Sequence, residues 1–132
     1  MFTSNREDYL RALYILGENE SEIKSIDIAK YLKVSKPSVT EMMQELSREG
    51  LVLYKKYSPI KLTEKGKRIA ENLTSKHRLI EIFLKNTLKL DKNNVHEEAH
   101  RLEHAFSDES ISKLRRFLGN PKIDPHGKPI PR

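Results

Sequence analysis

The strongest constraint on the fold is a change of hydrophobic period in the first half of the chain. Two successive apolar patterns at helical spacing are separated by a tight turn, and the second begins near Pro37, a residue suited to the first position of a helix. Gly50 ends this pattern, and residues 51–54 and 60–62 then predict two short strands joined by a basic turn. The order helix, turn, helix and hairpin predicts a winged helix-turn-helix, whose second helix enters the major groove of DNA.

A DNA-binding surface is predicted from the polar residues of this motif. Those that can reach base edges from the second helix and its N-terminal turn are Ser35, Lys36, Pro37, Ser38, Thr40, Glu41 and Gln44. Those placed by the turns and the wing to meet the phosphate backbone are Lys24, Lys55, Lys56 and Lys61. A net charge of +6 agrees with a polyanionic partner, although 33% charged residues of both signs suit any solvated surface. The alternative is a protein-binding module with a solvated lysine face.

Composition removes several other classes of protein. The chain has no cysteine, so disulfides, zinc fingers and thiol switches are excluded, and only nitrogen and oxygen ligands remain for a metal. No apolar run approaches the roughly 18 residues of a membrane span, and residues 1–8 lack the apolar core of a signal peptide. We therefore expect a cytoplasmic protein without a membrane partner. A hydrophobic content of 36% is low for a chain of this size, and a homodimer would bury more surface.

Four of the five histidines fall within residues 77–104, together with glutamates at helical spacings. Neutral imidazole and carboxylate are ligands for first-row divalent metals. His100, Glu103 and His104 are related by three and four residues, so their side chains can converge on one ion. Because His96 is separated from His104 by eight residues, about 12 Å along a helix, two metal sites are predicted rather than one.

The two predicted sites divide the candidate ligands between them. The first consists of Asp8, from the opening helix, His100, Glu103 and His104. The second consists of His96 together with His77 and Glu81, which are four residues apart on one helix. Two alternatives involve no metal: polar residues on a helical face are often exposed to solvent, and a histidine within an apolar stripe is often a core residue. The concentration of four histidines at these spacings favours metal binding.

A rival motif overlaps these residues. His96, Glu97 and His100 match H-E-x-x-H, the zinc-protease motif in which the glutamate acts as general base. Such an enzyme needs a substrate cleft and a further ligand, which Glu103 or His104 could supply. The chain is short for a protease of this kind, and the DNA-binding pattern takes most of its first half. With neither a Gly-rich phosphate loop nor a nucleophile motif in the sequence, we predict a protein that is not an enzyme and has no small-molecule substrate.

Three segments carry a resemblance to a known family: V-H-E-E-A-H-R-L-E-H at residues 95–104, S-D-E at residues 107–109 and G-K-P-I-P at residues 127–131. From Asp8 to the tail, the chain resembles the diphtheria toxin repressor family of iron- and manganese-dependent transcriptional repressors. The resemblance implies a mainly α-helical protein, in which a winged helix-turn-helix with a small β-hairpin wing precedes a helical metal-binding and dimerisation domain. It also implies a primary metal site and an ancillary metal site that correspond to the two sets predicted from helix spacing.

Departures from the family pattern concern the identity of the metal. Iron-responsive members usually have Met and Cys at the positions of Asp8 and His100, and manganese-responsive members have Glu at the positions of Arg11 and His100. The chain combines features of both groups, so the expected cofactor is Fe(II) or Mn(II), with Zn, Co or Ni able to bind in vitro. Larger relatives continue into an SH3-like domain that contributes ancillary ligands. We expect a two-domain form without it, whose second site is either completed by water or an anion or weak.

These patterns predict three regions: a winged helix-turn-helix domain at residues 1–73, a helical metal-binding and dimerisation domain at residues 74–119, and a Pro-rich tail at residues 120–132. The expected protein is a homodimeric, metal-switched repressor of metal-homeostasis genes that binds a near-palindromic operator in double-stranded DNA. Metal that joins Asp8 to the later ligands would favour one orientation of the DNA-binding domain among several. The alternative is a metal-independent winged-helix regulator or protein-binding module, in which the histidines tune a pH response.

Overall fold

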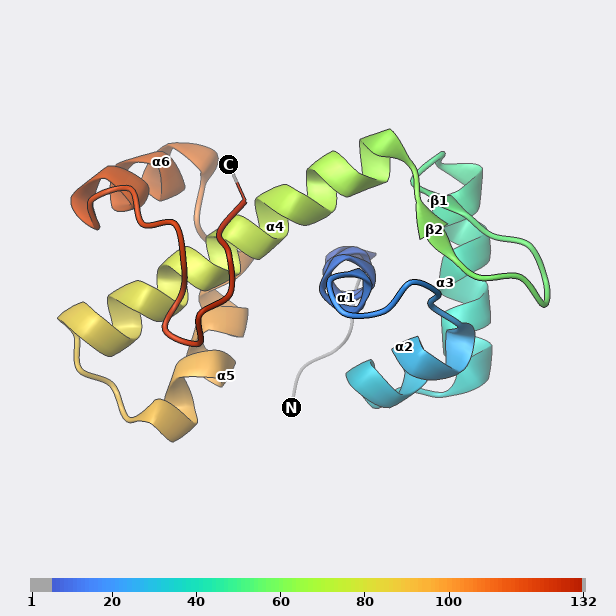
Figure 1. Ribbon diagram of the computed structural model, residues 1–132, viewed down its shortest axis with the longest axis horizontal. Coiled ribbons are helices and arrows are strands. Elements are labelled where there is room, and N and C mark those ends of the chain that lie inside the picture. The colour runs from blue at the N-terminus through green and yellow to red at the C-terminus, as the bar shows by residue number, and fades with distance from the viewer. Residues whose placement is uncertain (1–5, 132) are drawn as a thin grey trace. The chain divides into compact units, whose positions relative to one another are not determined.

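The computed structural model describes residues 6–131 of the 132-residue chain. The described part is mainly helical and contains one two-stranded antiparallel sheet, as the sequence predicts (Figure 1). The chain divides into two compact units, residues 1–71 and 72–132, and each has buried apolar residues of its own. Within the described residues, no helix is long and apolar enough to cross a lipid bilayer.

Three helices and a hairpin make up most of the N-terminal unit. They are α1 (Arg6–Gly17), α2 (Ser25–Leu32), α3 (Lys36–Arg48), β1 (Val52–Leu53) and β2 (Lys61–Leu62). The three helices contact one another, α1 contacts β2, and α3 contacts β1. Their fully buried apolar residues include Leu13, Ile28, Val39, Met43, Leu46 and Ile60. The element order is that of a winged helix-turn-helix, which confirms the predicted fold class.

The paired part of the hairpin is shorter than the strands predicted at residues 51–54 and 60–62. Strands β1 and β2 pair in the register Val52 opposite Leu62 and Leu53 opposite Lys61. The amide of Ile60 donates instead to the carbonyl of Ile23, at 2.8 Å, so Ile60 bonds to the segment that precedes α2. This hydrogen bond joins the wing to the helical part of the unit, in addition to the pairing between the two strands of the wing.

Local caps set the turn between α2 and α3. Lys33 ends α2 in the left-handed conformation, with φ of 58°. Ser35 then caps α3, because its Oγ accepts a hydrogen bond from the amide of Ser38 at 3.2 Å, and Pro37 lies in the first turn of the helix. The caps start α3 at Lys36 and leave its N-terminal residues exposed.

The C-terminal unit is built on the second half of a long helix. Helix α4 (Glu64–Ile82) continues into a π-helical segment, η1 (Phe83–Thr87), which the hydrophobic pattern does not predict. Helices α5 (Lys92–Glu103) and α6 (Asp108–Phe117) follow. The buried apolar residues of this unit are Leu79, Ile80, Ile82, Leu84, Val95, Ala99, Ile111, Leu114 and Ile130.

The tail folds back along the C-terminal unit (Figure 1). Pro129 closes an isolated antiparallel bridge, and Ile130 is buried among the apolar residues of the unit. The carbonyl of Pro129 accepts a hydrogen bond from Arg78 Nη1 of α4, and the carbonyl of Pro131 accepts one from Arg115 Nη2 of α6 at 3.2 Å. Residues 120–131 contain no helix, and side chains of α4 and α6 hold them in place.

Gly66, near the start of α4, provides a test of the packing between α4 and the hairpin. A Cβ atom on Gly66 would lie 2.0 Å from the carbonyl oxygen of Leu51. An alanine in a helix ordinarily stabilises relative to glycine by up to about 1 kcal/mol. We expect Gly66→Ala instead to lower the free energy of unfolding by about 1–3 kcal/mol, because the overlap involves backbone atoms. Urea denaturation measures this change.

Gly17→Ala is the matched control, because its Cβ would meet only Ile23 Cδ1, at an ordinary 3.6 Å. It should change the free energy of unfolding by less than about 0.5 kcal/mol. If Gly66→Ala stabilised the protein, α4 would not approach Leu51 as closely as described.

Candidate metal centres and DNA-binding surface

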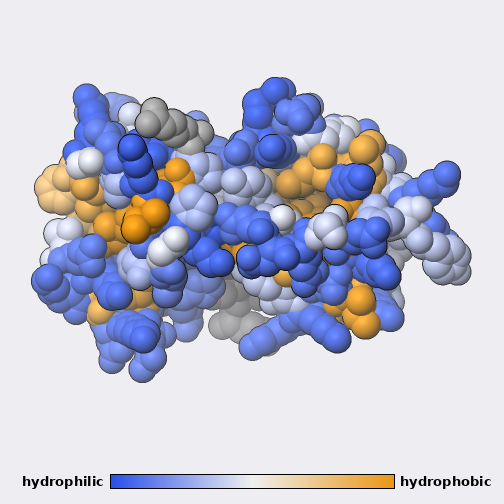
Figure 2. Space-filling model, viewed as in Figure 1, coloured by the Kyte–Doolittle hydropathy of each residue, from blue (hydrophilic) through white to orange (hydrophobic). Residues whose placement is uncertain are grey.

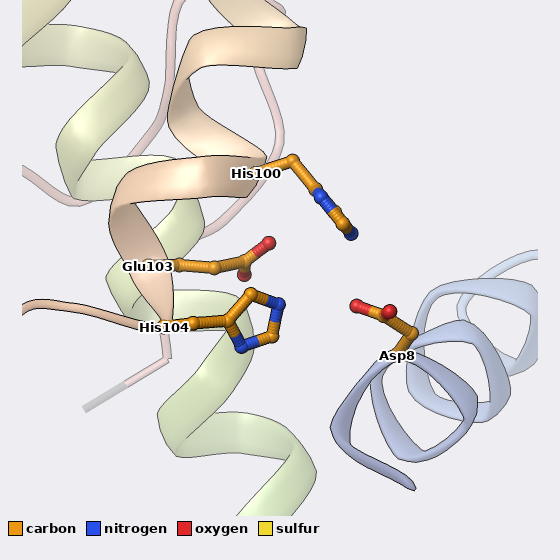
Figure 3. A group of neighbouring side chains, drawn as sticks. All are labelled: Asp8, His100, Glu103 and His104. Carbon is orange, nitrogen blue, oxygen red and sulfur yellow. The ribbon is translucent and has the colours of Figure 1, made fainter. Parts of the chain in front are cut away.

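Three metal-ligating side chains project from the C-terminal part of α5 (Figure 3). They are His100, Glu103 and His104, and their ligand atoms lie within 4.8 Å of one another. His100 and Glu103 are buried, whereas His104 is exposed and forms the C-cap directly after α5. The rings of His100 and His104 meet edge to face, with 5.3 Å between their centroids. Spacings of three and four residues thus bring the three ligands, here called the α5 set, to one face of the helix.

His77 and Glu81 of α4 form a second group with His96 of α5, here called the α4 set. Its ligand atoms also lie within 4.8 Å of one another. Nε2 of His77 is 3.1 Å from Nδ1 of His96 and 3.4 Å from Oε2 of Glu81, and the same Glu81 oxygen is 3.4 Å from Nδ1 of His96. His77 and Glu81 are buried, whereas the side chain of His96 is 67% exposed. The α4 set therefore has a buried side and a side open to solvent.

The imidazole of His77 contacts both sets. Its Nδ1 is 3.5 Å from Oε1 of Glu103 in the α5 set, while its Nε2 faces Glu81 and His96. A neutral imidazole that donates a hydrogen bond from Nδ1 to Glu103 keeps a lone pair on Nε2 for a metal. One ring thus connects the two groups of candidate ligands.

Glu81 carries its charge in a buried position. Burial disfavours the carboxylate and acts to raise the pKa of Glu81, but hydrogen bonds and charge interactions with His77 and His96 together outweigh burial. Their net effect holds the pKa of Glu81 well below its usual range. Glu81 is therefore ionised at neutral pH, which is the state in which a carboxylate binds a metal.

Asp8, the remaining ligand predicted for the first site, belongs to the N-terminal unit. It lies in the first turn of α1, is 3% exposed, and is labelled in Figure 3. Burial raises the pKa of the neighbouring Tyr9, and the negative charge of Asp8 raises it further. Asp8 thus supplies a buried negative charge on α1.

A third group of ligating side chains is not predicted from the residue pattern. Glu81 also lies close to Asp124 and His126 of the tail, and the ligand atoms of these three residues are within 4.8 Å of one another. The sequence signal for this group is weak, since Asp124 and His126 are merely two residues apart in D-P-H-G. Their proximity to Glu81 arises only when the tail folds back onto α4.

The residues predicted to contact DNA occupy accessible positions of the N-terminal unit. Thr40 is half-buried, and the exposed positions on α3 and at its N-cap are Ser35, Lys36, Pro37, Ser38, Glu41 and Gln44. The basic residues of the turn before α2 and of the hairpin are exposed as well: Lys24, Lys55, Lys56 and Lys61. On the face shown in Figure 2, hydrophilic residues cover most of the surface and apolar residues appear in separate patches.

The tip of the wing adds a residue for which the sequence pattern gave no role in DNA binding. Tyr57 is 95% exposed and has a left-handed backbone, with φ of 67°. Nζ of Lys56 lies 5.2 Å from the centre of its ring. An aromatic ring and a cation are thus presented together to solvent at the end of the wing.

Fold and candidate sites define a class of protein, in which a winged helix-turn-helix is followed by a helical unit with histidine and carboxylate metal ligands. Comparison with known proteins gives the family. Residues 1–60 match the family model for the iron-dependent repressor N-terminal DNA-binding domain, and residues 63–132 match that for the iron-dependent repressor metal-binding and dimerisation domain. The chain therefore belongs to the iron-dependent repressor family, whose members are metal-dependent transcriptional repressors. The predicted membership of the diphtheria toxin repressor family is confirmed.

Individual relatives agree with this assignment. The chain is 43% identical over 113 residues to the uncharacterized HTH-type transcriptional regulator MJ0568 of Methanocaldococcus jannaschii. The aligned region covers 85% of this chain and 90% of the relative. It is 35% identical over 114 residues to the HTH-type transcriptional regulator MntR of Bacillus velezensis (strain DSM 23117 / BGSC 10A6 / LMG 26770 / FZB42). This alignment covers 86% of the present chain and 80% of MntR.

Solved structures are similar over nearly the whole chain. The manganese regulator SloR has a TM-score of 0.88 and 45% identity, and the match covers 99% of this chain and 61% of SloR. A manganese-dependent transcriptional repressor in complex with manganese has a TM-score of 0.89 and 35% identity, with 97% and 59% covered. ScaR with bound Zn²⁺ has a TM-score of 0.83 and 43% identity, with 98% and 60% covered. The chain thus spans about three fifths of the length of these solved chains.

The family identifies the chain as a repressor and not an enzyme, and the structure divides the H-E-x-x-H motif between two groups. His96 lies with His77 in the α4 set, whereas His100 belongs to the α5 set. The intervening Glu97 is exposed and forms an ion pair with Arg101 at 3.3 Å. The histidines of the motif therefore belong to two different groups of candidate ligands on one helix.

His77→Phe tests the connection between the two sets. The substitution removes an imidazole partner from Glu81 and Glu103, which are both buried. We expect the metal-free protein to lose about 1–3 kcal/mol of unfolding free energy, because each buried carboxylate loses one of the polar groups that offset the cost of its burial. Urea denaturation in the presence of a chelator measures the loss.

His96→Ala is the control, because it removes a histidine of the same set whose side chain is exposed. It should lower the unfolding free energy by less than about 0.5 kcal/mol. A loss below about 0.5 kcal/mol in His77→Phe as well would mean that the imidazole of His77 does not stabilise the buried carboxylates.

Proposed function

We propose that the chain is an Fe(II)- or Mn(II)-dependent repressor that binds operator DNA as a homodimer and controls metal-homeostasis genes. The observation that carries this proposal is the presence, in one chain, of a winged helix-turn-helix and of two histidine and carboxylate sets in the helical unit. Family membership supplies metal dependence, DNA binding and dimerisation in general terms. The ion, the residues that bind it and the operator are the parts that we propose.

Each proposed metal site has a donor set that suits these ions. The primary ion is bound by Asp8, His100, Glu103 and His104, and the ancillary ion is bound by His77, Glu81 and His96. Carboxylate and imidazole donors without sulfur suit Fe(II) and Mn(II), and they allow Co, Ni or Zn to bind in vitro. The solved relatives support this choice, since one is a complex with manganese and another contains Zn²⁺.

The proposed switch is a shift in population. Without metal, the DNA-binding unit samples several orientations, and an ion shared by Asp8 and the α5 set favours the orientation that fits the operator. Linkage makes the effect reciprocal, so DNA tightens metal binding by the same factor, typically about 1–3 kcal/mol. Because His77 contacts Glu103, an ancillary ion on His77 also orients a primary ligand.

In the proposed complex, residues 1–73 bind DNA, residues 74–119 bind metal and dimerise, and residues 120–132 form the tail. Helix α3 lies in the major groove, where the exposed polar residues at its N-terminal end contact base edges. Lys24, Lys55 and Lys56 contact phosphates. The two α3 helices of a homodimer then meet half-sites about one helical turn apart on a near-palindromic operator.

Fluorescence anisotropy tests the switch, with labelled DNA selected from a random pool by the Mn(II)-loaded protein. Mn(II) or Fe(II) should tighten DNA binding by about tenfold or more relative to chelator, within the usual range of coupling between two ligands. Asp8→Asn should abolish most of this response, because it removes a charged ligand with little change in shape. Glu7→Gln, an exposed neighbour on α1, is the matched control and should respond as the wild type does.

Equal affinity with metal and with chelator would refute the switch, and a full response of Asp8→Asn would exclude Asp8 as a ligand. Thermal unfolding distinguishes the proposed metal-dependent repressor from the alternative of a metal-independent regulator. Metal at 100 times its Kd should add about 2.7 kcal/mol of stability if it binds only the folded protein. No stabilisation by Fe(II), Mn(II) or Zn(II) would favour a metal-independent regulator.

Lys56→Ala tests the role of the wing. The variant should bind all DNA sequences more weakly, and the slope of log affinity against log salt concentration should fall by about 0.9, because one phosphate contact is lost. Gln44→Ala should instead change the sequence preference and leave the slope unchanged. Lys113→Ala, an exposed lysine of α6, is the control. An unchanged slope in Lys56→Ala would remove this residue from the phosphate contacts.

A further inference from the structure

The tip of the wing carries an aromatic side chain that makes little contact with the rest of the protein. The loop between β1 and β2 extends away from the helices of the N-terminal unit, and Tyr57 lies in the turn of this loop (Figure 1). Tyr57 is 95% exposed, whereas Phe117, the next most exposed large apolar residue of the described part of the chain, is 69% exposed. A ring with this exposure contributes almost nothing to the stability of the fold.

The backbone at Tyr57 has a conformation that is unusual for an aromatic residue. Its φ of 67° lies in the left-handed region, where glycine, asparagine and aspartate are the common residues. The amide of Ser58 donates to the carbonyl of Lys55 at 3.0 Å and closes the turn. A glycine would suit this conformation better than a tyrosine and would lose almost no packing. An unfavourable backbone under an exposed ring therefore points to a function of the side chain.

Hydrogen bonds at the base of the wing attach it to the helices of the same unit. The amide of Ile60 donates to the carbonyl of Ile23, as described above. Thr63, which follows β2, donates from its amide to the carbonyl of Leu51 at 3.0 Å and from its hydroxyl to the carbonyl of Gly50 at 2.7 Å. Gly50 directly follows the C-cap of α3. The base of the wing is thus held against the C-terminal end of the helix that we propose for the major groove.

Positive charge surrounds the exposed ring. Lys55 and Lys56 directly precede Tyr57, Lys61 lies on β2, and all three lysines are exposed. Residues 51–63 include no acidic residue, so the charge of the hairpin is entirely positive. Such a hairpin is complementary to the phosphates of DNA. Lysines bound to phosphates bring a neighbouring ring against the sugars and base edges that lie between the two strands.

The groove that such a ring meets follows from the place of α3. Major and minor grooves alternate along a duplex, so a hairpin held at one end of a helix in the major groove faces the backbone and the minor groove beyond it. The minor groove is about 6 Å wide, which is too narrow for a helix but admits a single side chain. A ring at the tip of a hairpin has the shape that this groove requires.

We propose that Tyr57 enters the minor groove beside each half-site and makes the protein prefer A·T base pairs there. The minor-groove edge of an A·T pair presents only acceptors, to which the hydroxyl of Tyr57 can donate a hydrogen bond. A G·C pair adds the guanine N2 amino group, which obstructs the ring. A·T-rich grooves are also narrow and strongly negative, which favours the neighbouring lysines. The inference rests on the proposed function, in that α3 must bind DNA at these half-sites.

Fluorescence anisotropy with three versions of one operator tests this assignment. The operator is the DNA selected by the Mn(II)-loaded protein, and only the base pairs beside its half-sites are changed, to A·T, G·C or I·C, where I is inosine. An I·C pair lacks the N2 amino group, so it resembles A·T in the minor groove and G·C in the major groove. The wild type should bind the A·T and I·C operators alike and the G·C operator about tenfold more weakly, within the range expected for an unfavourable base pair.

Variants of the wing assign this preference to the ring. Tyr57→Ala should bind the three operators with equal affinity, close to that of the wild type for the G·C operator. Tyr57→Phe keeps the ring without its hydroxyl and should retain part of the preference. Leu53→Ala is the matched control, because Leu53 is a 61% exposed apolar residue on a paired strand of the same hairpin, and it should discriminate as the wild type does. The urea midpoint of Tyr57→Ala should equal that of the wild type, which separates a lost contact from a lost fold.

Three results would overturn the inference: equal affinity of the wild type for all three operators, an A·T preference that persists in Tyr57→Ala, or binding of the I·C operator that is as weak as that of the G·C operator. The last result would place the contact in the major groove. In each of these cases the wild type still binds DNA in response to metal, so the proposed function stands. If the wild type binds no operator with Mn(II) or Fe(II), the proposed function itself fails, and the two failures are therefore distinguishable.

Discussion

The C-terminal unit depends on the burial of carboxylates against imidazoles. Glu81 and Glu103 are both buried, and the two nitrogens of His77 face one carboxylate each. Removing a carboxylate from water is costly unless hydrogen bonds and opposite charge compensate for it. The contacts that stabilise these carboxylates in the fold also keep Glu81 ionised. The folded unit thus keeps the Glu81 carboxylate in the ionised form that can bind a metal.

Much of the candidate site could be predicted from the sequence, because its ligands are related by local helix geometry. His100, Glu103 and His104 are three and four residues apart, and any helix over this segment brings them to one face. Local spacing alone does not place His96 beside His77 and Glu81, because His96 is on α5 and the other two are on α4. Their grouping depends on how α4 packs against α5. Helix spacing separated His96 from the α5 set, and His96 was therefore grouped with His77 and Glu81, a pair four residues apart on one helix; the family resemblance agreed with this grouping.

The features that could not be predicted depend on tertiary structure or on departures from regular geometry. The apolar pattern of residues 83–87 is equally compatible with an α-helix, so it gave no indication of the π-helical segment η1. Asp124 and His126 are in a Pro-rich tail without a periodic pattern, and only the return of this tail to α4 places them near Glu81. The predicted strands were longer than β1 and β2, because Ile60 bonds to Ile23 instead of extending the pairing.

In the α4 set, His77 and Glu81 are buried and His96 is exposed, and this division has a kinetic consequence for the proposed ancillary site. Glu81 holds its charge permanently inside the unit, whereas the ring of His96 is largely in water. An ion that binds there, as we propose, would meet the exposed ring of His96 before the buried carboxylate, and it could leave by the same route without opening the interior. We expect a site with such an open side to exchange its ion with the surrounding solution, which is the behaviour that a metal sensor requires.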